Sequence, residues 1–507
     1  MNKSQKKAGV IISYATELVK VLTSLFYTPI MLRLLGSSEY GLYHLVHSVV
    51  AYLGLLSLGF GSAYMRFYSR SSAKGDKNEI ARLNGMFLTI FSIISVICLL
   101  CGSAMVLHAE RIFGAGLTAE ELKKAKVLMG IMVVNLALTF PNTVFNNFVT
   151  AHERFLFQKA LLFFQSLLNP FLTLPLLLLG YGSVGMVLVS TALTAAVLLL
   201  NLFFCIAKLK IRFSFSGFEW GLFREMFAFT FFLFLNQIID QINWSVDKFL
   251  LGRMISTTAV AIYSTGSLLN TLYIQMSTSV SNVFVPQIHR IVSGGNDDKL
   301  LTEVFARVGR MQFLVLALVM SGIVFFGQSF IRMWAIDGYD NAYYVAILLV
   351  IPETVPLIQN IGIEIQRAKN KHKTRSVVYF FMAIANVFIS IPLIGRFAEI
   401  GAAAGTTISL VVANICFMNW YYQKRIGLDL SYFWNNILSM CKGLIAPVIL
   451  GTFILLYVNT NGLSRFILWA AAYTVVYAIS MWLFGMNDDE KRIVRSVYSR
   501  FIKKRQA

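Results

Sequence analysis

Charged residues are scarce in this sequence. Asp, Glu, Lys and Arg make up 13% of its 507 residues, whereas soluble domains carry about 25%. Hydrophobic residues reach 57% instead. Apolar runs of about 20 residues, the length that a helix needs to cross a bilayer, recur from one end of the chain to the other. The scarcity of charge therefore excludes an ordinary soluble protein and predicts an all-α polytopic membrane protein.

Features of several other protein classes are also missing. No loop is long enough to form a soluble domain, and the longest predicted outer loop covers only residues 108–126. No glycine-rich loop followed by Lys-Ser or Lys-Thr occurs, which argues against nucleotide hydrolysis at a Walker A site. The first apolar run follows a basic start, but it is too long for a signal peptide and lacks a small-residue cleavage site. We therefore expect an uncleaved first span and a function that is carried out within the membrane.

Cysteine and histidine do not form a pattern that predicts a redox or metal site. The chain has five cysteines, all in or beside apolar runs. Cys98-x-x-Cys101 lies within a predicted span and outside any βαβ unit, so we interpret it as two small apolar side chains. His44 and His47 are one helical turn apart, but no further ligand lies at metal-binding spacing. These two histidines are expected to pack or to line a cavity.

The apolar runs predict fourteen spans, and the basic residues predict their orientation. With the N-terminus in the cytoplasm, cytoplasmic segments hold 33 of the 44 Lys and Arg residues and outer segments hold ten. This bias follows the positive-inside rule, so both termini are expected in the cytoplasm. The net charge of +20 then reflects topology and not nucleic-acid binding. The predicted spans are 9–32, 40–64, 84–107, 127–150, 160–179, 184–207, 223–246, 257–284, 308–330, 343–364, 377–395, 400–422, 441–459 and 464–485.

Features of the first half recur in the second half at offsets of 216 to 224 residues. Leu34-Leu35-Gly36 recurs as Leu250-Leu251-Gly252, and we expect both at equivalent outer turns. Six spans per repeat is an even number, so the two repeats share one orientation around a central cavity. The predicted domains are an N-terminal six-helix lobe at 1–210, a C-terminal six-helix lobe at 211–425, two additional spans within 426–486 and a basic amphipathic cytoplasmic tail at 487–507. The tail is either an interfacial helix or a solvated basic segment.

The first span of each repeat carries polar residues on one helical face. In span one these are Ser13, Glu17, Lys20, Ser24 and Thr28, and in span seven they are Asn236, Asp240, Asn243 and Asp247, with Gln237, Gln241 and Lys248 on the adjoining edge. Asn270 belongs to a looser polar edge on span eight. Ionisable residues inside a span are costly and usually face a protein-lined cavity. We expect these faces to line the central cavity, the alternative being polar contacts that hold helices together.

Several stretches resemble a known family. The run TPIMLRLLGSSEYGLYHLVHSVVAYLGLLSLGFGSAYMRFYS at 28–69 looks like the opening of bacterial polysaccharide and oligosaccharide flippases. DKFLLGRMISTTAVAIYSTGSLLNTLY at 247–273, Pro286-Gln287-Ile288 and RAKNKHKTRS at 367–376 are similar to second-half segments of that family. The family includes the O-antigen flippases of the multidrug/oligosaccharidyl-lipid/polysaccharide exporter superfamily.

The resemblance implies a transporter and not an enzyme. Its expected substrate is undecaprenyl-diphosphate-linked oligosaccharide, moved from the cytoplasmic to the periplasmic leaflet of the bacterial inner membrane by alternating access. Its product would feed lipopolysaccharide or another surface polysaccharide, with a polymerase and glycosyltransferases as pathway partners. No cofactor is expected beyond a candidate Na⁺ or H⁺ coupling ion. The alternatives are a cation-coupled multidrug exporter of the same superfamily and, more remotely, an integral-membrane glycan polymerase or acyltransferase.

This substrate suggests roles for the polar residues, because a diphosphate needs cationic or amide donors and glycan hydroxyls suit amides. Glu17 and Lys20 have a second interpretation, since they can neutralise each other across one helical turn. Arg66 and Arg290 can equally serve as positive-inside anchors. The candidate substrate-binding residues are Lys20, Lys248, Arg66, Arg290, Asn236, Asn243, Gln237, Gln241 and Asn270, and the candidate ion-coupling residues are Glu17, Asp240 and Asp247.

Overall fold

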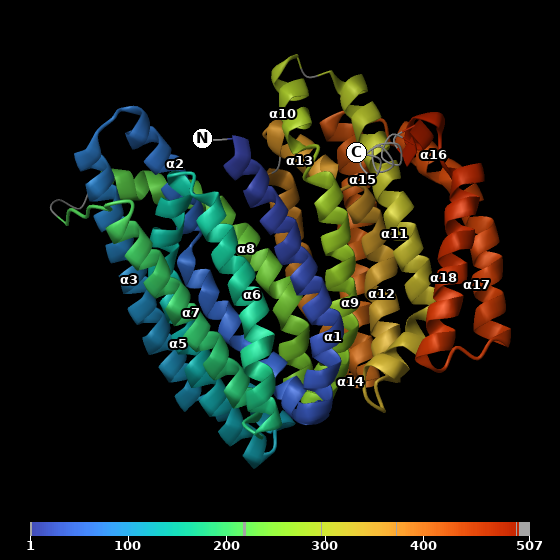
Figure 1. Ribbon diagram of the computed structural model, residues 1–507, viewed down its shortest axis with the longest axis horizontal. Coiled ribbons are helices and arrows are strands. Elements are labelled where there is room, and N and C mark those ends of the chain that lie inside the picture. Colours follow the sequence, from blue (N-terminus) through green and yellow to red (C-terminus); the bar gives the residue numbers. More distant parts are fainter. Residues whose placement is uncertain (1–2, 216–219, 296, 372, 493, 496–507) are drawn as a thin grey trace. The chain divides into compact units, whose positions relative to one another are not determined.

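The computed structural model describes residues 3–215, 220–295, 297–371, 373–492 and 494–495 (Figure 1). Every regular element within these ranges is a helix. Ten helices are long and apolar enough to cross a membrane, or eleven when the bent helix α8 is counted. The expected all-α polytopic membrane protein is therefore confirmed. The exact number of fourteen spans stays a prediction, and most of the expected C-terminal tail lies outside the described residues.

The chain divides into two compact units, each described by itself. Unit 1 comprises Met1–Ser264 with Ile394–Glu399, and unit 2 comprises Thr265–Leu393 with Ile400–Ala507. This division is defined by contacts within the chain, whereas the predicted lobes are defined by the sequence repeat. The bounds of the predicted lobes therefore stay a prediction. The elements of unit 1 are α1 (Lys3–Val50), η1 (Ala51–Ser57), α2 (Phe60–Ala73), α3 (Lys77–Leu107), α4 (Ala109–Phe113), η2 (Gly114–Gly116), α5 (Ala119–Ala151), α6 (Phe155–Leu178), α7 (Gly182–Ala207), α8 (Trp220–Met254) and the start of α9 (Thr257–Ser281).

The remaining elements belong chiefly to unit 2. After α9 they are α10 (Val285–Ser293), α11 (Asp298–Trp334), α12 (Asp340–Ile358), α13 (Ile361–Ala368), α14 (Lys373–Leu410), η3 (Val411–Phe417), α15 (Met418–Tyr421), η4 (Tyr422–Ile426), α16 (Leu430–Met440), η5 (Cys441–Leu444), α17 (Ile445–Tyr457), α18 (Leu463–Ser480) and η6 (Met481–Gly485).

Two sharp backbone kinks divide very long helical stretches. Ala15–Ala73 and Lys373–Ile426 are apolar stretches of 59 and 54 residues, each long enough for two crossings. The first bends at Gly36, whose φ of 75° and ψ of 170° belong to a region that is almost restricted to glycine. The second bends at Ala398, with φ of 48°. The turn predicted at Leu35-Gly36 is confirmed.

The second predicted span, at residues 40–64, is not one continuous α-helix. The α-helix ends at Val50, and the 3-10 helix η1 follows. Leu58 and Gly59 then have φ angles of 48° and 72°, which interrupt the helix before α2 begins. Consecutive left-handed residues end a helix, and Gly59 adopts this conformation without a Cβ penalty. Hydropathy alone does not reveal such a break, because the whole run is apolar.

The turn expected at Leu251-Gly252 is also wrong. Gly252 lies inside the last turn of α8, which continues to Met254. A Cβ atom at Gly252 would lie 2.5 Å from the side chain of Leu45, closer than real carbon contacts. This glycine therefore allows α8 to approach α1, and it does not form a turn.

Helix N-termini in both units carry ordinary capping residues. Asp76 caps α3 by accepting hydrogen bonds from the backbone N–H groups of Asn78 and Glu79 at 2.8 and 3.0 Å. Asp297 caps α11 in the same way, at an offset of 221 residues that falls within the range of the sequence repeat. Thr118 and Glu121 form a reciprocal capping box at the start of α5.

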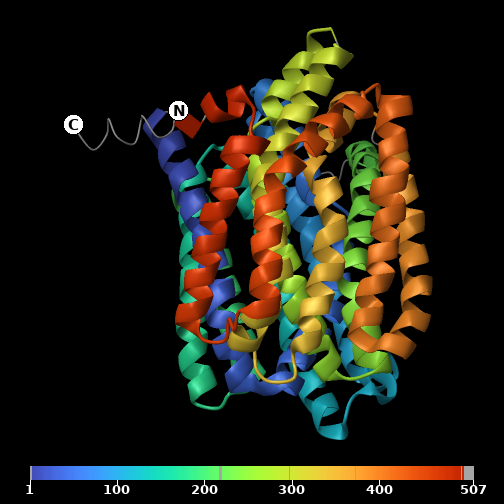
Figure 2. The same cartoon turned by 90° about the vertical axis from the view of Figure 1, so that its right-hand side faces the viewer.

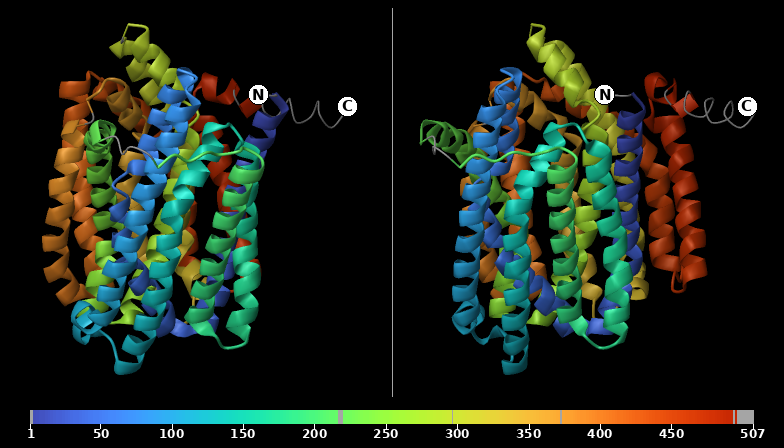
Figure 3. Two further views of the ribbon diagram at one scale, coloured as in Figure 1. Left: turned by 90° about the vertical axis from the view of Figure 1, so that its left-hand side faces the viewer. Right: turned by 60° about the vertical axis from the view of Figure 1, so that its left-hand side comes forward.

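Helices α3, α5 and α7 of unit 1 lie side by side (Figure 3), and small residues and amides contribute to their contacts. A Cβ atom at Gly102 on α3 would lie 2.3 Å from Val133 on α5, so glycine permits this close contact. The Asn201 amide on α7 donates to Asn142 on α5 at 2.9 Å. Interhelical hydrogen bonds of this kind are common in membranes, where helix association gains little from the hydrophobic effect.

Unit 2 is built around α11, which packs against α12, α16, α17 and α18 (Figure 2). Its core combines aromatic rings with close helix contacts. Phe305 packs against Phe433 with ring centroids 4.5 Å apart. A Cβ atom at Gly309 would lie 2.6 Å from the Phe433 ring, so glycine lets α16 approach α11.

Candidate functional site

The polar face of α8 runs from an exposed end to a buried end within unit 1. Asp240 is exposed and Asn243 is half-buried, whereas Asp247, two turns from Asp240, is only 2% exposed. α8 packs against α1 and α2 in this unit. A buried carboxylate in an apolar bundle needs polar partners, because its desolvation is costly.

Tyr263 on α9 supplies one partner of Asp247. Its hydroxyl donates a hydrogen bond of 2.6 Å to Asp247 Oδ2, and Tyr263 itself is 5% exposed. Tyr52 on η1 lies within electrostatic range of the same carboxylate. Asp247 therefore lies near side chains from two other elements, α9 and η1, that a sequence pattern does not connect to it.

Two histidines from the second half of α1 lie near Lys248. The Lys248 ammonium acts electrostatically on both His44 and His47. The His44 ring stands edge-on to Tyr40 with centroids 4.5 Å apart, and His47 stacks on Tyr43 at 6.4 Å.

His44 keeps one polar atom unused. Its Nε2 atom is buried and has no hydrogen-bond partner within the described residues. We call His44, His47, Asp247, Lys248 and Tyr263 the polar cluster of unit 1. It combines one carboxylate, one ammonium and two imidazoles, groups that exchange protons or pair with an anion.

The polar cluster joins two of the stretches that carry the family resemblance. Residues 28–69 supply its histidines, and residues 247–273 supply its other members. These stretches approach closely at Gly41, where a Cβ atom would lie 1.8 Å from the backbone carbonyl oxygen of Thr257. Glycine is required there because no side chain fits. The two motifs thus form one packed structure, although they are about 200 residues apart in sequence.

Two carboxylates hold together the end of unit 1 beside the Gly36 kink. Glu39 accepts hydrogen bonds from the backbone N–H and hydroxyl of Ser183 at 2.6 and 2.7 Å, and from Lys124 at 2.7 Å. Glu121 accepts from the hydroxyls of Ser38 at 2.5 Å and Thr257 at 2.6 Å. These contacts connect α1 with α5, α7 and α9. We did not predict roles for Glu39 or Glu121. The polar residues at 37–39, which include Glu39 itself and the Glu121 partner Ser38, were a signal in the sequence.

The other predicted site residues of unit 1 have more local contacts. Lys20 Nζ pairs with Glu17 Oε1 at 2.9 Å, and both side chains are about half exposed, at 48% and 55%. This is the mutual neutralisation that the sequence left open. Arg66 is exposed, and its guanidinium lies 4.5 Å from the centroid of the Phe229 ring, a cation–π contact.

The amides on α8 are divided between local bonds and unused groups. Gln241 donates to Ser245, one turn further along α8, at 2.6 Å. The side-chain oxygen of Gln237 is buried without a partner in the described part of the chain. Asn236 and Asp240 both have polar partners. The face that was predicted as cavity lining therefore includes both satisfied and unused polar groups.

Asn270 and Arg290 lie in unit 2. Asn270 on α9 is buried at 4% exposure, whereas Arg290 on α10 is exposed. Of the predicted set, the consecutive residues Asp247 and Lys248 belong to the polar cluster, and Glu17 pairs with Lys20. No group of three or more His, Cys, Asp and Glu residues within the described ranges has the arrangement of a metal site.

Unit 2 contains a further polar cluster that the sequence did not single out. Glu353 on α12 acts electrostatically on Tyr273 and on Tyr379. The Arg375 guanidinium lies 4.5 Å from the Tyr379 ring centroid, and the Tyr379 hydroxyl donates to Asn414. A signal was available in the glutamate that follows Pro352 in the middle of a predicted span.

Comparison with known proteins extends these findings. A family model described as “Polysaccharide biosynthesis protein” matches residues 7–292. “Uncharacterized membrane protein EpsK” of Bacillus subtilis (strain 168) is 21% identical over 486 residues, which cover 94% of this chain and 95% of that protein. “Putative O-antigen transporter” of Shigella flexneri is 17% identical over 399 residues, covering 78% of this chain and 92% of that protein.

Solved structures share the fold. The lipid II flippase MurJ in an inward closed conformation matches with a TM-score of 0.74 and 16% identity, covering 94% of this chain and 98% of that one. An inward-facing multidrug resistance MATE transporter of the MOP superfamily matches with a TM-score of 0.65 and 13% identity, covering 81% and 98%. The family model spans more than half of the chain and includes the packed motifs around the polar cluster. The chain therefore belongs to the polysaccharide biosynthesis protein family, with the fold of the MurJ and MATE transporters.

Proposed function

We propose that this protein is a flippase that moves undecaprenyl-diphosphate-linked oligosaccharide from the cytoplasmic to the periplasmic leaflet by alternating access. The observation that carries this proposal is the family match over residues 7–292, which includes the packed motifs at 28–69 and 247–273. A relative named as an O-antigen transporter and a structural neighbour named as a lipid II flippase support a lipid-linked glycan substrate. The bacterial inner membrane, with both termini in the cytoplasm, is the proposed location.

The chemistry of α8 suits this substrate. Lys248 provides a cation for a diphosphate, and the neighbouring amides of Asn236, Gln237 and Asn243 provide donors and acceptors for glycan hydroxyls. Phosphate groups are recognised most strongly by charge-assisted hydrogen bonds. In this proposal, Lys248 contacts the headgroup and the amides contact the sugars.

The polar cluster also offers a place for ion coupling. Asp247 is a buried carboxylate, and its hydrogen bond from Tyr263 fixes its orientation. Proton or Na⁺ binding there would neutralise a buried charge and so favour one packing of α8 over another. We propose Asp247 as the coupling residue, with Asp240 and Glu17 as the remaining candidates.

Export of small molecules is the second candidate function, because MATE multidrug transporters share the fold. Drug susceptibility distinguishes the two functions. A strain that lacks an exporter becomes more sensitive to cationic drugs, whereas a strain that lacks the flippase accumulates lipid-linked oligosaccharide on the cytoplasmic side.

The direct test uses purified protein in liposomes that contain a fluorescent lipid-linked oligosaccharide. We expect transfer between leaflets with the native protein, and a strong loss of transfer for Lys248→Gln. Lys123→Gln is the matched control, because Lys123 is an exposed lysine of the same unit away from the polar cluster. Failure of the native protein to move the substrate would contradict the proposed function. Transfer at the native rate by the Lys248→Gln protein would contradict the role assigned to Lys248.

A further inference from the structure

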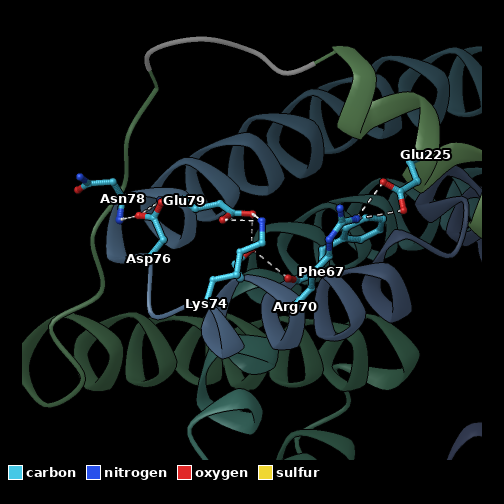
Figure 4. Close-up of polar contacts among 8 residues, drawn as sticks. Phe67, Arg70, Lys74, Asp76, Asn78, Glu79 and Glu225 are labelled. Carbon is cyan, nitrogen blue, oxygen red and sulfur yellow. Dashed lines mark hydrogen bonds and ion pairs between the residues drawn. The ribbon is translucent and has the colours of Figure 1, made fainter.

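A cavity of about 270 Å³ lies at the end of unit 1 where α2 turns into α3 and α8 begins. Figure 4 shows the polar contacts of Arg70, Lys74 and Glu79 at this end. Three cationic side chains line it, Arg70 and Lys74 from α2 and Arg82 from α3. Glu79 and Glu225 contribute two carboxylates. The lining therefore carries one more positive than negative charge. The polar cluster contributes no residue to this cavity.

The ion pairs inside the cavity are loose. Arg70 contacts both carboxylate oxygens of Glu225 through the single atom Nη1, at 3.3 Å each, so the fork of the guanidinium is not used. The two side chains are 58% and 47% exposed. Lys74 Nζ lies 3.2 Å from Glu79 Oε1. Exposed pairs of this geometry contribute little to stability, so a phosphate group that accepts two N–H hydrogen bonds from the guanidinium can replace the Glu225 carboxylate.

The nearby Asp76 is not among the residues that line the cavity; it caps the start of α3 and lies within electrostatic range of Arg82 and Lys74. Hydrogen bonds from the backbone N–H groups of Glu79 and Asn78 lower the pKa of Asp76. Figure 4 shows its carboxylate turned toward these N–H groups, whereas Arg70 and Lys74 extend toward Glu225 and Glu79.

Apart from Ser71, the remaining wall of the cavity is apolar. Phe67, Leu83, Met86 and Leu222 line it, and the flanking helices α2 and α3 belong to apolar stretches long enough to cross a membrane. The distribution of Lys and Arg predicts that this end faces the cytoplasm, where the membrane surface carries anionic lipids. The cavity therefore matches two parts of a phospholipid: its basic residues match the phosphate, and its apolar wall matches the glycerol-acyl region.

We propose that this cavity binds the phosphate group of an anionic phospholipid of the cytoplasmic leaflet. Arg70 donates two parallel N–H hydrogen bonds from its guanidinium to the phosphate oxygens, and Lys74 and Arg82 add positive charge. The apolar wall contacts the first carbons of an acyl chain. Binding displaces Glu225 from Arg70, so lipid occupancy and the Arg70–Glu225 contact between α2 and α8 exclude each other.

The test measures phosphatidylglycerol binding to the purified full chain in detergent by mass spectrometry of the intact complex, with phosphatidylcholine as the neutral lipid. The variant Arg70→Gln/Lys74→Gln/Arg82→Gln is expected to lose roughly tenfold or more in affinity, since each basic residue near a membrane surface contributes to binding. Lys208→Gln/Lys210→Gln/Lys299→Gln is the matched control, because it removes the same charge from positions outside the cavity on the same predicted side. The control is expected to bind as the native chain does.

A variant of opposite sign keeps the test decisive if the triple variant fails to fold. Glu225→Gln removes the competing carboxylate, and we expect it to raise the affinity for phosphatidylglycerol. Unchanged binding by the cavity variants, or equal losses in the cavity and control variants, would overturn the proposal. Equally tight binding of glycerol 3-phosphate would identify a soluble phosphate as the ligand instead. Binding of polyprenyl diphosphate without phosphatidylglycerol would assign the cavity to the transported lipid.

Discussion

Replacing Glu490 with glutamine is predicted to destabilise unit 2 by about 3 kcal/mol, the lower end of the range for breaking a buried ion pair. Glu490 forms a two-pronged pair with Arg310 on α11, with Nε–Oε1 and Nη2–Oε2 distances of 2.7 and 2.8 Å. The side chains are only 5% and 8% exposed. Glutamine keeps the shape and one acceptor oxygen, but it leaves the guanidinium charge buried without a counter-charge.

The surroundings of Arg310 explain why the charge cannot find another partner. Its Nη1 donates to the Asn436 carbonyl at 2.7 Å and the Ser439 hydroxyl at 2.9 Å, and its Nη2 also donates to the Gly485 carbonyl at 3.0 Å. All five N–H donors of the guanidinium are thus used. None of the remaining acceptors carries a negative charge.

The assay is chemical denaturation of the purified protein in mixed micelles, followed by tryptophan fluorescence. Asp489→Asn is the matched control, because Asp489 is the preceding residue and pairs with Arg492 on the surface, with side chains 64% and 80% exposed. The control is expected to change stability by less than about 1 kcal/mol. A Glu490→Gln effect as small as that of the control would refute the buried pair. Combining Glu490→Gln with Arg310→Gln should cost less than the sum of the single changes, since the partners interact directly.

Three further predictions address unit 1. Gly41→Ala should sharply reduce the amount of folded protein, because the new Cβ atom would overlap the α9 backbone. Gly54→Ala should be tolerated, because no atom lies within 4 Å of a Cβ atom there. Size-exclusion profiles compare the two variants, and equal profiles would contradict the close approach of α9 to Gly41. Asp76 should stabilise the start of α3 at any pH above its ordinary pKa, and this effect should be lost as the pH falls through the lowered pKa of Asp76. Amide hydrogen exchange at the start of α3 should therefore speed up, relative to the intrinsic rate, only in acid. Protection that is insensitive to acid would refute the cap. Tyr263→Phe should weaken transport less than Asp247→Asn, because it removes one hydrogen bond and not the carboxylate; the liposome assay compares them, and the reverse order would contradict the role of Asp247.

The sequence was most informative where a single segment carries the physical signal. The turn at Gly36 follows from a glycine between two apolar runs, and the structure confirms it. The Glu17–Lys20 pair was foreseen as one interpretation, since the two residues are one helical turn apart. The helical break at Leu58-Gly59 was missed, because backbone conformation within an apolar run leaves no trace in hydropathy.

Contacts between distant segments were beyond the sequence. Arg310 and Glu490 are 180 residues apart, and no periodic pattern relates them. The histidines of the polar cluster were expected only to pack or to line a cavity, and Lys248 was noted separately on another helix. Their proximity depends on how α1 and α8 pack, which glycine positions such as Gly252 permit through contacts that only coordinates reveal.

The sequence by itself determined the class of this protein. Scarce charge, apolar runs and basic asymmetry define a helical membrane protein, since the bilayer imposes helix length and charge placement on each segment separately. The tertiary structure alone decided which polar groups meet. Desolvation makes each buried charge in an apolar bundle dependent on a partner, and the partners of Asp247, Glu39 and Arg310 come from elsewhere in the chain. Their identity is fixed by helix packing.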